Sequence, residues 1–340
     1  MSLYGRWEET NGLASKYSLD DSTQSQAVVF GIRRLDDEGG SIHSELRLRD
    51  GMNSQELEAV SGLSQTFALS DTVDAHFIAE RLEILEGSTR SATALGGGLD
   101  FGDQTWQGTT RLEWRRLDAS SLTPLDDTTD SVMASVSFAR KMSGDWTGLL
   151  RNYALITDAR DQRGSQMQNR FQLGAAYRPR GMSSLDVLLR YENKSERNSE
   201  LVSLESRNVH IASTHLNWHP NHKLWLSGRV AVKDLRETLG GVEDTYQAYL
   251  VSGRVTHDVT DRIDVGVMAG VMGSPDSKAR EEVYGLEVGY RVKDNVWLSA
   301  GHNFAGFSDR DLSGREQTER GWYLRLRMKF DEKWLQSWLE

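Results

Sequence analysis

The sequence predicts an all-β protein, a single antiparallel transmembrane β-barrel with both chain ends on the periplasmic side. We expect about 18 strands, or about 16 if the less regular segments are miscounted. Three observations lead to this prediction. Apolar and polar residues alternate in one segment after another, the connections alternate between short and long, and the chain is lean in apolar residues. Each is typical of an outer-membrane barrel, whose strands turn one face to lipid and the other to water.

The composition argues against a soluble protein of the same length. The 340 residues are 38% apolar and the mean hydropathy is −0.55, whereas a soluble chain of this size would have to bury several cores. No apolar run approaches ~18 residues, which excludes a transmembrane helix. The net charge of −10 argues against a nucleic-acid-binding protein. The first ten residues lack a signal-peptide pattern, and we expect that a leader or a longer region precedes them in the natural protein.

Alternating segments can be followed along the whole chain. In each, apolar side chains occupy every second position and therefore share one face of a strand. The predicted strands are centred on residues 3–7, 28–32, 42–48, 55–69, 72–86, 93–101, 106–114, 132–138, 146–156, 171–177, 185–191, 204–218, 224–232, 249–255, 263–271, 284–290, 296–304 and 322–330. The segments at 55–69, 72–86 and 204–218 alternate less cleanly, and we expect bulges in the first two.

The connections give the strand count. Short turns are predicted near 36–41, 69–73, 101–105, 141–145, 179–184, 219–223, 259–262 and 293–295. Longer connections are predicted near 9–24, 50–55, 86–91, 117–131, 157–165, 194–203, 236–244, 273–280 and 307–318. These eight turns and nine longer connections imply 18 strands, with both termini on the side of the short turns. All four prolines fall in these predicted connections, as we expect for a continuous hydrogen-bonded sheet.

The last strand shows the pattern most clearly. Its apolar side chains, which we expect to face lipid, are Trp322, Leu324, Leu326, Met328 and Phe330. We expect Phe330 to close the barrel against the first strand, near Leu3 to Trp7. The barrel domain is thus predicted over 1–330. The remaining 331–340 form a short amphipathic tail, because Trp334, Leu335, Trp338 and Leu339 share one helical face.

The opposite face of the predicted strands is rich in cations. The lumen-lining residues predicted by this alternation are Arg111, Arg115, Arg151, Arg170, Arg190, Arg229, Arg254, Arg291, Arg325, Arg327 and Lys329. A basic lumen favours anionic solutes, because low-dielectric walls focus the field of the charges. The alternative is that these cations pair with inward acids such as Glu113 and Glu192, or hold a plug segment inside the barrel. In that case they give the lumen no selectivity for anions.

Two functions follow from these alternatives. The first is an outer-membrane channel or translocation pore for anionic solutes or polymers. The second is a membrane anchor, a barrel with a plugged lumen that holds a larger modular surface protein and transports nothing. Either barrel would have outer-membrane lipid, lipopolysaccharide and the barrel-assembly machinery as partners, and no nucleic acid.

Other chemistry finds little support in the sequence. His215, His219 and His222 lie near one predicted turn, but no acid or cysteine completes a recognisable metal-binding set. No Ser/His/Asp spacing stands out, and the glycine-rich stretch at 95–102 lacks the GK[ST] of a phosphate-binding loop. We therefore expect no catalytic residues, no metal and no cofactor.

The segment 295–332 resembles the end of the C-terminal barrel in large modular Gram-negative outer-membrane proteins. The matching residues are Asn303-Phe304, Gly306-Phe307, Asp309 to Asp311, Gly321, Tyr323-Leu324 and Lys329-Phe330-Asp331. The final strand is also similar to the signal that the barrel-assembly machinery reads, carried here by Gly321, Tyr323, Leu324, Leu326, Met328 and Phe330. The resemblance implies a barrel in the outer membrane and no catalytic residues.

Overall fold

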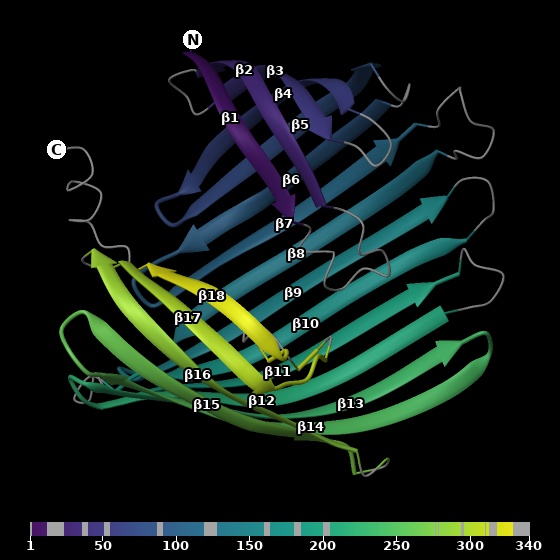
Figure 1. Cartoon of the computed structure of the whole chain (residues 1–340). Coiled ribbons are helices and arrows are strands. Elements are labelled where there is room, and N and C mark those ends of the chain that lie inside the picture. The colour runs from purple at the N-terminus through teal and green to yellow at the C-terminus, as the bar shows by residue number, and fades with distance from the viewer. Residues whose placement is uncertain are drawn as a thin grey trace.

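In the part of the chain that it describes, the computed structural model contains one antiparallel sheet of 18 strands, in which each strand pairs with its neighbours in the sequence (Figure 1). The strands are β1 (Ser2–Asn11), β2 (Gln24–Leu35), β3 (Gly40–Asp50), β4 (Gln55–Ser70), β5 (Val73–Glu86), β6 (Ser91–Gly102), β7 (Trp106–Leu117), β8 (Thr129–Lys141), β9 (Trp146–Ala159), β10 (Ser165–Tyr177), β11 (Leu185–Asn198), β12 (Glu205–Asn221), β13 (Leu224–Leu239), β14 (Val242–Asp258), β15 (Ile263–Gly273), β16 (Arg280–Lys293), β17 (Val296–Ala305) and β18 (Gly321–Met328). The predicted count of 18 is confirmed, and the alternative of 16 is excluded.

The structure describes residues 2–11, 24–35, 40–50, 55–86, 91–118, 128–159, 164–179, 185–199, 205–275, 277, 279–293, 296–309, 311–312 and 318–328. Within these ranges no helix is long and apolar enough to cross a membrane. The predicted tail at 331–340 lies outside the described residues.

One predicted connection is wrong. The chain does not leave the sheet over 236–244, because β13 continues to Leu239 and β14 begins at Val242. The two strands are joined by Gly240 and Gly241, whose φ angles are +59° and +82°. Two successive residues with positive φ make the tight hairpin turn that matches the twist of the strands. The polar residues that suggested a loop are strand residues.

The predicted irregularity of the fourth and fifth strands is confirmed. The register between β4 and β5 shifts at Leu57/Glu58 and again at Ala68/Ser70. Each shift marks an irregularity of the bulge type, which interrupts the period-two pattern that a regular strand would show.

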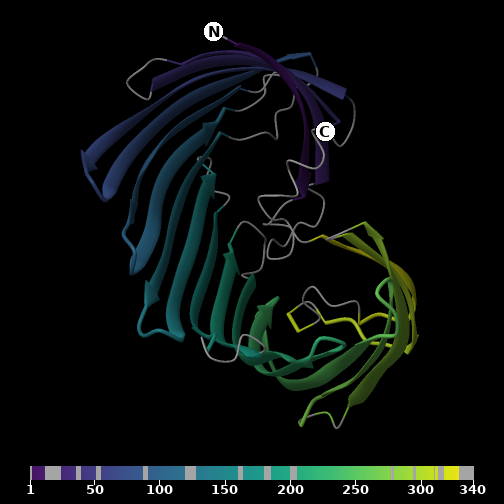
Figure 2. The same cartoon turned by 90° about the vertical axis from the view of Figure 1, so that its left-hand side faces the viewer.

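The sheet curls, so that it has an inner and an outer face (Figure 2). The outer face carries the apolar stripe of each strand, with large exposed side chains such as Val232, Leu286 and Leu324. Trp146 and Tyr177, at the short-turn ends of β9 and β10, lie side by side on this face with ring centroids 4.9 Å apart. An apolar band edged by aromatic residues is what a lipid-facing barrel surface requires.

A buried apolar cluster lies on the inner face of β12–β16, where a water-filled lumen would need polar residues. Its members are Val209, Ile211, Ala231, Ala248, Leu250, Met268, Met272 and Val283 from the strands, and Phe307 and Leu312 from the connection between β17 and β18. The connection thus covers an apolar part of the wall. This cluster explains why 204–218 alternates poorly. The apolar side chains of β12 lie on the inner face at Val209 and Ile211 and change to the outer face at Leu216 and Trp218.

The predicted closure of the barrel is not made by the described residues. β1 and β18 lie apart in both views (Figures 1 and 2), and no pairing or contact between them is found in the described ranges. Phe330, which was expected to close against Leu3 to Trp7, lies outside those ranges. Pairing β1 with β18 would join the two strands most distant in sequence, whereas every pairing observed is between consecutive strands.

Candidate functional site

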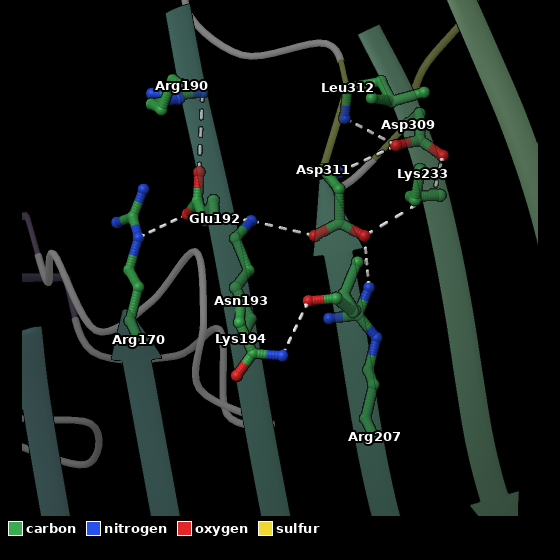
Figure 3. Close-up of polar contacts among 11 residues, drawn as sticks. Arg170, Arg190, Glu192, Asn193, Lys194, Arg207, Lys233, Asp309, Asp311 and Leu312 are labelled. Atoms are coloured by element: carbon green, nitrogen blue, oxygen red, sulfur yellow. Dashed lines mark hydrogen bonds and ion pairs between the residues drawn. The ribbon is translucent and has the colours of Figure 1, made fainter. Parts of the chain in front are cut away.

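The connection between β17 and β18 folds back onto the inner face of β11, β12 and β13 (Figure 3). Its Asp311 carboxylate accepts a hydrogen bond of 2.9 Å from the Lys194 ammonium and another from the Arg207 guanidinium. The Lys233 ammonium lies 3.5 Å from the same carboxylate and 2.5 Å from that of Asp309. Three cations from three neighbouring strands therefore converge on two acids of one connection.

Local hydrogen bonds shape the connection for this contact. The Asp309 carboxylate accepts hydrogen bonds of 2.9 and 2.7 Å from the backbone N–H groups of Asp311 and Leu312. This is the turn that aspartate commonly forms with the backbone that follows it. It presents Asp311 to the wall, while the Leu312 carbonyl accepts a 2.5 Å hydrogen bond from the Arg229 guanidinium.

Two further contacts hold the ends of the connection. The backbone N–H of Phe307 donates to the carbonyl of Thr318 at 2.9 Å, and the Asn303 amide donates to the carbonyl of Glu319 at 2.9 Å. Gly306 lies against this backbone so closely that a Cβ atom would overlap it. The described parts of the connection are therefore tied to each other as well as to the wall.

The charges at this site are almost fully buried. The side chains of Lys194 and Asp311 are 4% and 0% exposed. Burial favours the neutral form of the Asp311 carboxyl, but the neighbouring Lys194, Arg207 and Lys233 outweigh burial and hold its pKa below the ordinary value of 3.8. The acid is therefore ionised at neutral pH, and removing one partner would leave a buried charge uncompensated.

Two other buried carboxylates organise the cations of the inner face. Glu192 accepts a 2.5 Å hydrogen bond from Arg170 and lies 3.5 Å from the guanidinium of Arg190. Glu287 accepts a 2.9 Å hydrogen bond from Arg254 and another from Arg325. Both acids are less than 4% exposed. Four of the predicted lumen cations are thus held by inward acids.

The other predicted cations differ in their surroundings. Arg229 binds the connection, and Arg115 lies 2.9 Å from Glu113. Arg111 and Arg151 have no ion-pair partner among the described residues. By strand alternation, Arg291 shares the face of Glu287. The side chain of Arg327, like Lys329, lies outside what the structure describes.

Residues at both ends of the sheet share one arrangement. The Tyr323 ring of β18 lies over Gly301 of β17, and its hydroxyl donates a 3.1 Å hydrogen bond to Glu287 of β16. At the other end, the Tyr4 ring of β1 lies over Gly31 of β2, and its hydroxyl donates a hydrogen bond to Glu45 of β3. In each case the glycine leaves the space that the tyrosine ring fills.

The residues of the predicted assembly signal are placed as follows. Leu324 and Leu326 lie on the outer face, 76% and 61% exposed, and Tyr323 lies on the inner face. Gly321 begins β18 with a φ of +133°, a conformation that favours glycine. The side chain of Met328 and all of Phe330 lie outside the described part.

Several members of the site were not among the predicted lumen residues. Lys194 and Arg207 face inward and bind Asp311, and both could have been found by extending the alternation of their strands. Asp309 and Asp311 belong to the segment that carries the family resemblance, but no sequence pattern indicated that they reach the wall. Within the described ranges, no group of three His, Cys, Asp or Glu side chains could hold a metal ion.

No protein-family model matches the chain, and no curated protein matches it. The resemblance of 295–332 to modular outer-membrane proteins is not tested by these results and stays a prediction.

Among solved structures, the chain is similar to the FrpB iron transporter (F5-1 variant) from Neisseria meningitidis. The TM-score is 0.52 at 8% sequence identity, over 96% of this chain and 67% of that one. Weaker matches are the copper transporter OprC, with a TM-score of 0.47 at 11% identity over 96% of this chain and 75% of that one, and the NanC porin, with a TM-score of 0.31 at 15% identity over 62% and 96%. At such low identity the likeness to the iron transporter shows the fold alone. With 18 antiparallel strands in one sheet, the chain has the fold of the outer-membrane β-barrels.

Proposed function

We propose that the protein is an outer-membrane channel whose lumen is narrowed from inside by the connection between β17 and β18. The observation that carries this proposal is the docking of Asp309 and Asp311 on Lys194, Arg207 and Lys233. A connection held by buried ion pairs and by the apolar cluster occupies the part of the lumen next to β11–β16. The conducting path then follows the wall of β6–β10.

The charge along this path favours anions. Arg111 and Arg151 project from the inner face of β7 and β9 without an ion-pair partner in the described part of the chain. Arg170 and Arg190 are compensated by Glu192, Arg254 and Arg325 by Glu287, and Arg115 by Glu113. Any selectivity should therefore depend on these two arginines more than on Arg254 or Arg325.

Conductance in planar bilayers tests the proposal. The folded protein should give stepwise currents, and the reversal potential in a KCl gradient should show a preference for chloride. Exchanging Arg111 and Arg151 together for glutamine should reduce that preference, while Arg140→Gln, on the outer face, serves as the matched control and should leave it unchanged. If the double variant keeps the same preference for chloride, Arg111 and Arg151 do not determine the selectivity of the channel.

A membrane anchor is the second candidate, because a segment docked in this way on the inner face would also plug the lumen of a barrel that transports nothing. A folded barrel that gives no current would overturn the channel and favour the anchor. Under both proposals the protein lies in the outer membrane, contacts lipid and lipopolysaccharide through its apolar outer face, is inserted by the barrel-assembly machinery, and is not an enzyme. Recovery of the protein as a folded monomer without detergent would contradict both.

A further inference from the structure

A hollow of about 470 Å³ opens on the inner face of β7–β11, near the short-turn ends of these strands. Its polar lining consists of Gln107, Thr109, Ser137, Arg151, Gln172 and Arg190. This volume lies within the range of about 300–1,000 Å³ that is usual for small-molecule sites. The hollow lies beside the wall that the β17–β18 connection covers, and the two share strand β11.

Small side chains in neighbouring strands create the hollow. Gly174 of β10 lies opposite Leu149 of β9 on one side and Arg190 of β11 on the other. Ala139 of β8 lies opposite Leu149 as well. Because Gly174 and Ala139 fill little space, the longer neighbours form walls around them, with Leu149 as an apolar surface and Arg190 as a polar one.

Two arginines, Arg151 and Arg190, face the hollow with guanidinium N–H groups that are available to a ligand. Arg151 has no ion-pair partner in the described ranges, and it lies between Ser137 and Gln172 in the register of β8, β9 and β10. The Nε atom of Arg190 is buried without a hydrogen-bond partner, although its terminal nitrogen lies 3.5 Å from Glu192. The Thr109 hydroxyl is likewise buried without a partner.

This combination points to one class of ligand. Two guanidinium groups suit a carboxylate, which can accept two parallel hydrogen bonds from arginine. The amides of Gln107 and Gln172 and the hydroxyls of Thr109 and Ser137 suit the hydroxyl groups of a sugar, and Leu149 offers an apolar surface to the C–H face of a ring. We propose that the hollow is a binding site for a small acidic sugar, a sugar ring that bears a carboxylate. The proposal rests on the channel function and names the solute class that the channel would admit.

Saturation-transfer NMR on the detergent-folded protein, with D-glucuronate as the probe and D-glucose as its neutral counterpart, tests the site directly. Glucuronate should bind saturably and glucose should not. Arg151→Gln and Arg190→Gln should each weaken glucuronate binding by about tenfold or more, since each removes a charge-assisted hydrogen bond. Arg115→Gln, an inner-face arginine of β7 outside the hollow, is the control and should change the affinity less than about twofold. Ala139→Leu keeps both arginines but fills the hollow, and it should also abolish binding.

The outcomes separate this inference from the channel proposal. A protein that conducts but binds glucuronate no better than glucose overturns the sugar site and leaves the channel. A protein that binds glucuronate saturably but never conducts overturns the channel and leaves the site. If Arg115→Gln weakens glucuronate binding as much as Arg151→Gln does, the ligand is attracted by the overall positive charge of the wall, and the hollow is not a specific binding site. Circular dichroism of each variant confirms that the sheet is folded.

Discussion

Lys194 and Asp311 are separated by 117 positions in the sequence, yet the ammonium of one donates a 2.9 Å hydrogen bond to the carboxylate of the other. The contact links the middle of the chain to the connection before its last strand. It lies inside the curl of the sheet, where both side chains are withdrawn from water. Since a buried ion pair is weak evidence for stability but costly to break, the contact is better interpreted as fixing the position of the connection.

Replacing Asp311 by asparagine should release the connection. Lys194, Arg207 and Lys233 would lose the charge on which they converge, and a cost of about 3 kcal/mol is expected for breaking a buried ionic contact. Urea unfolding in detergent or lipid would measure the loss, and limited proteolysis would show whether the connection becomes accessible. Asp261→Asn, in the exposed turn between β14 and β15, is the matched control and should have little effect. Equal midpoints for the two variants would contradict the docking role.

The contact between Lys194 and Asp311 limits the pH range over which the β17–β18 connection stays docked. The folded pKa of Asp311 lies below its ordinary value of 3.8 because of the neighbouring cations. A depressed pKa contributes stability that is complete above the unfolded value and is lost as the pH falls through the folded value. We expect the connection to stay docked from pH 7 down to about pH 5 and to be released only in acid below pH 3.8. Proteolysis at pH 7 and 5, and conductance down to pH 3, would follow this change. In Asp311→Asn the acid-dependent step should be absent, and a step near pH 6 would contradict the assignment.

Leu312 should anchor the connection independently of charge. It is fully buried and belongs to the cluster of Val209, Leu250 and Phe307. Leu312→Ala should cost about 2–5 kcal/mol, the usual loss for a large-to-small change in a core. Leu312→Met, which roughly conserves volume, should cost less than about 1.5 kcal/mol. Thermal or urea unfolding would measure both variants, and comparable losses would show that the residue is not packed as described.

The strands were predictable from the sequence because their pattern is local. A period of two assigns each side chain to a face, so Leu324 and Arg325 were correctly separated. Alternation alone cannot say what covers a face. The pairing of Arg325 with Glu287 depends on the registers of β16–β18, and the docking of Asp311 depends on the path of a connection. The hairpin at Gly240 was missed because the polar residues around it were interpreted as a loop, although two adjacent glycines are a strong signal for a tight turn.

Tyr323 offers a test of how the last strand is held. Its ring crosses Gly301 and its hydroxyl donates to Glu287, which also binds Arg254 and Arg325. Tyr323→Phe keeps the ring and removes only the hydrogen bond to a carboxylate, so a loss of about 1.5–3 kcal/mol is expected.

Gly301→Ala should be the more damaging change, because the added Cβ would overlap the Tyr323 ring and force it off its position. Gly228→Ala, at an outer-face glycine of β13 where a Cβ meets only a backbone oxygen at 3.8 Å, controls for the general cost of replacing a strand glycine. Urea unfolding would rank the three variants. If Gly301→Ala is no worse than Gly228→Ala, the ring does not occupy the space above the glycine, and β18 is held by its pairing with β17 alone.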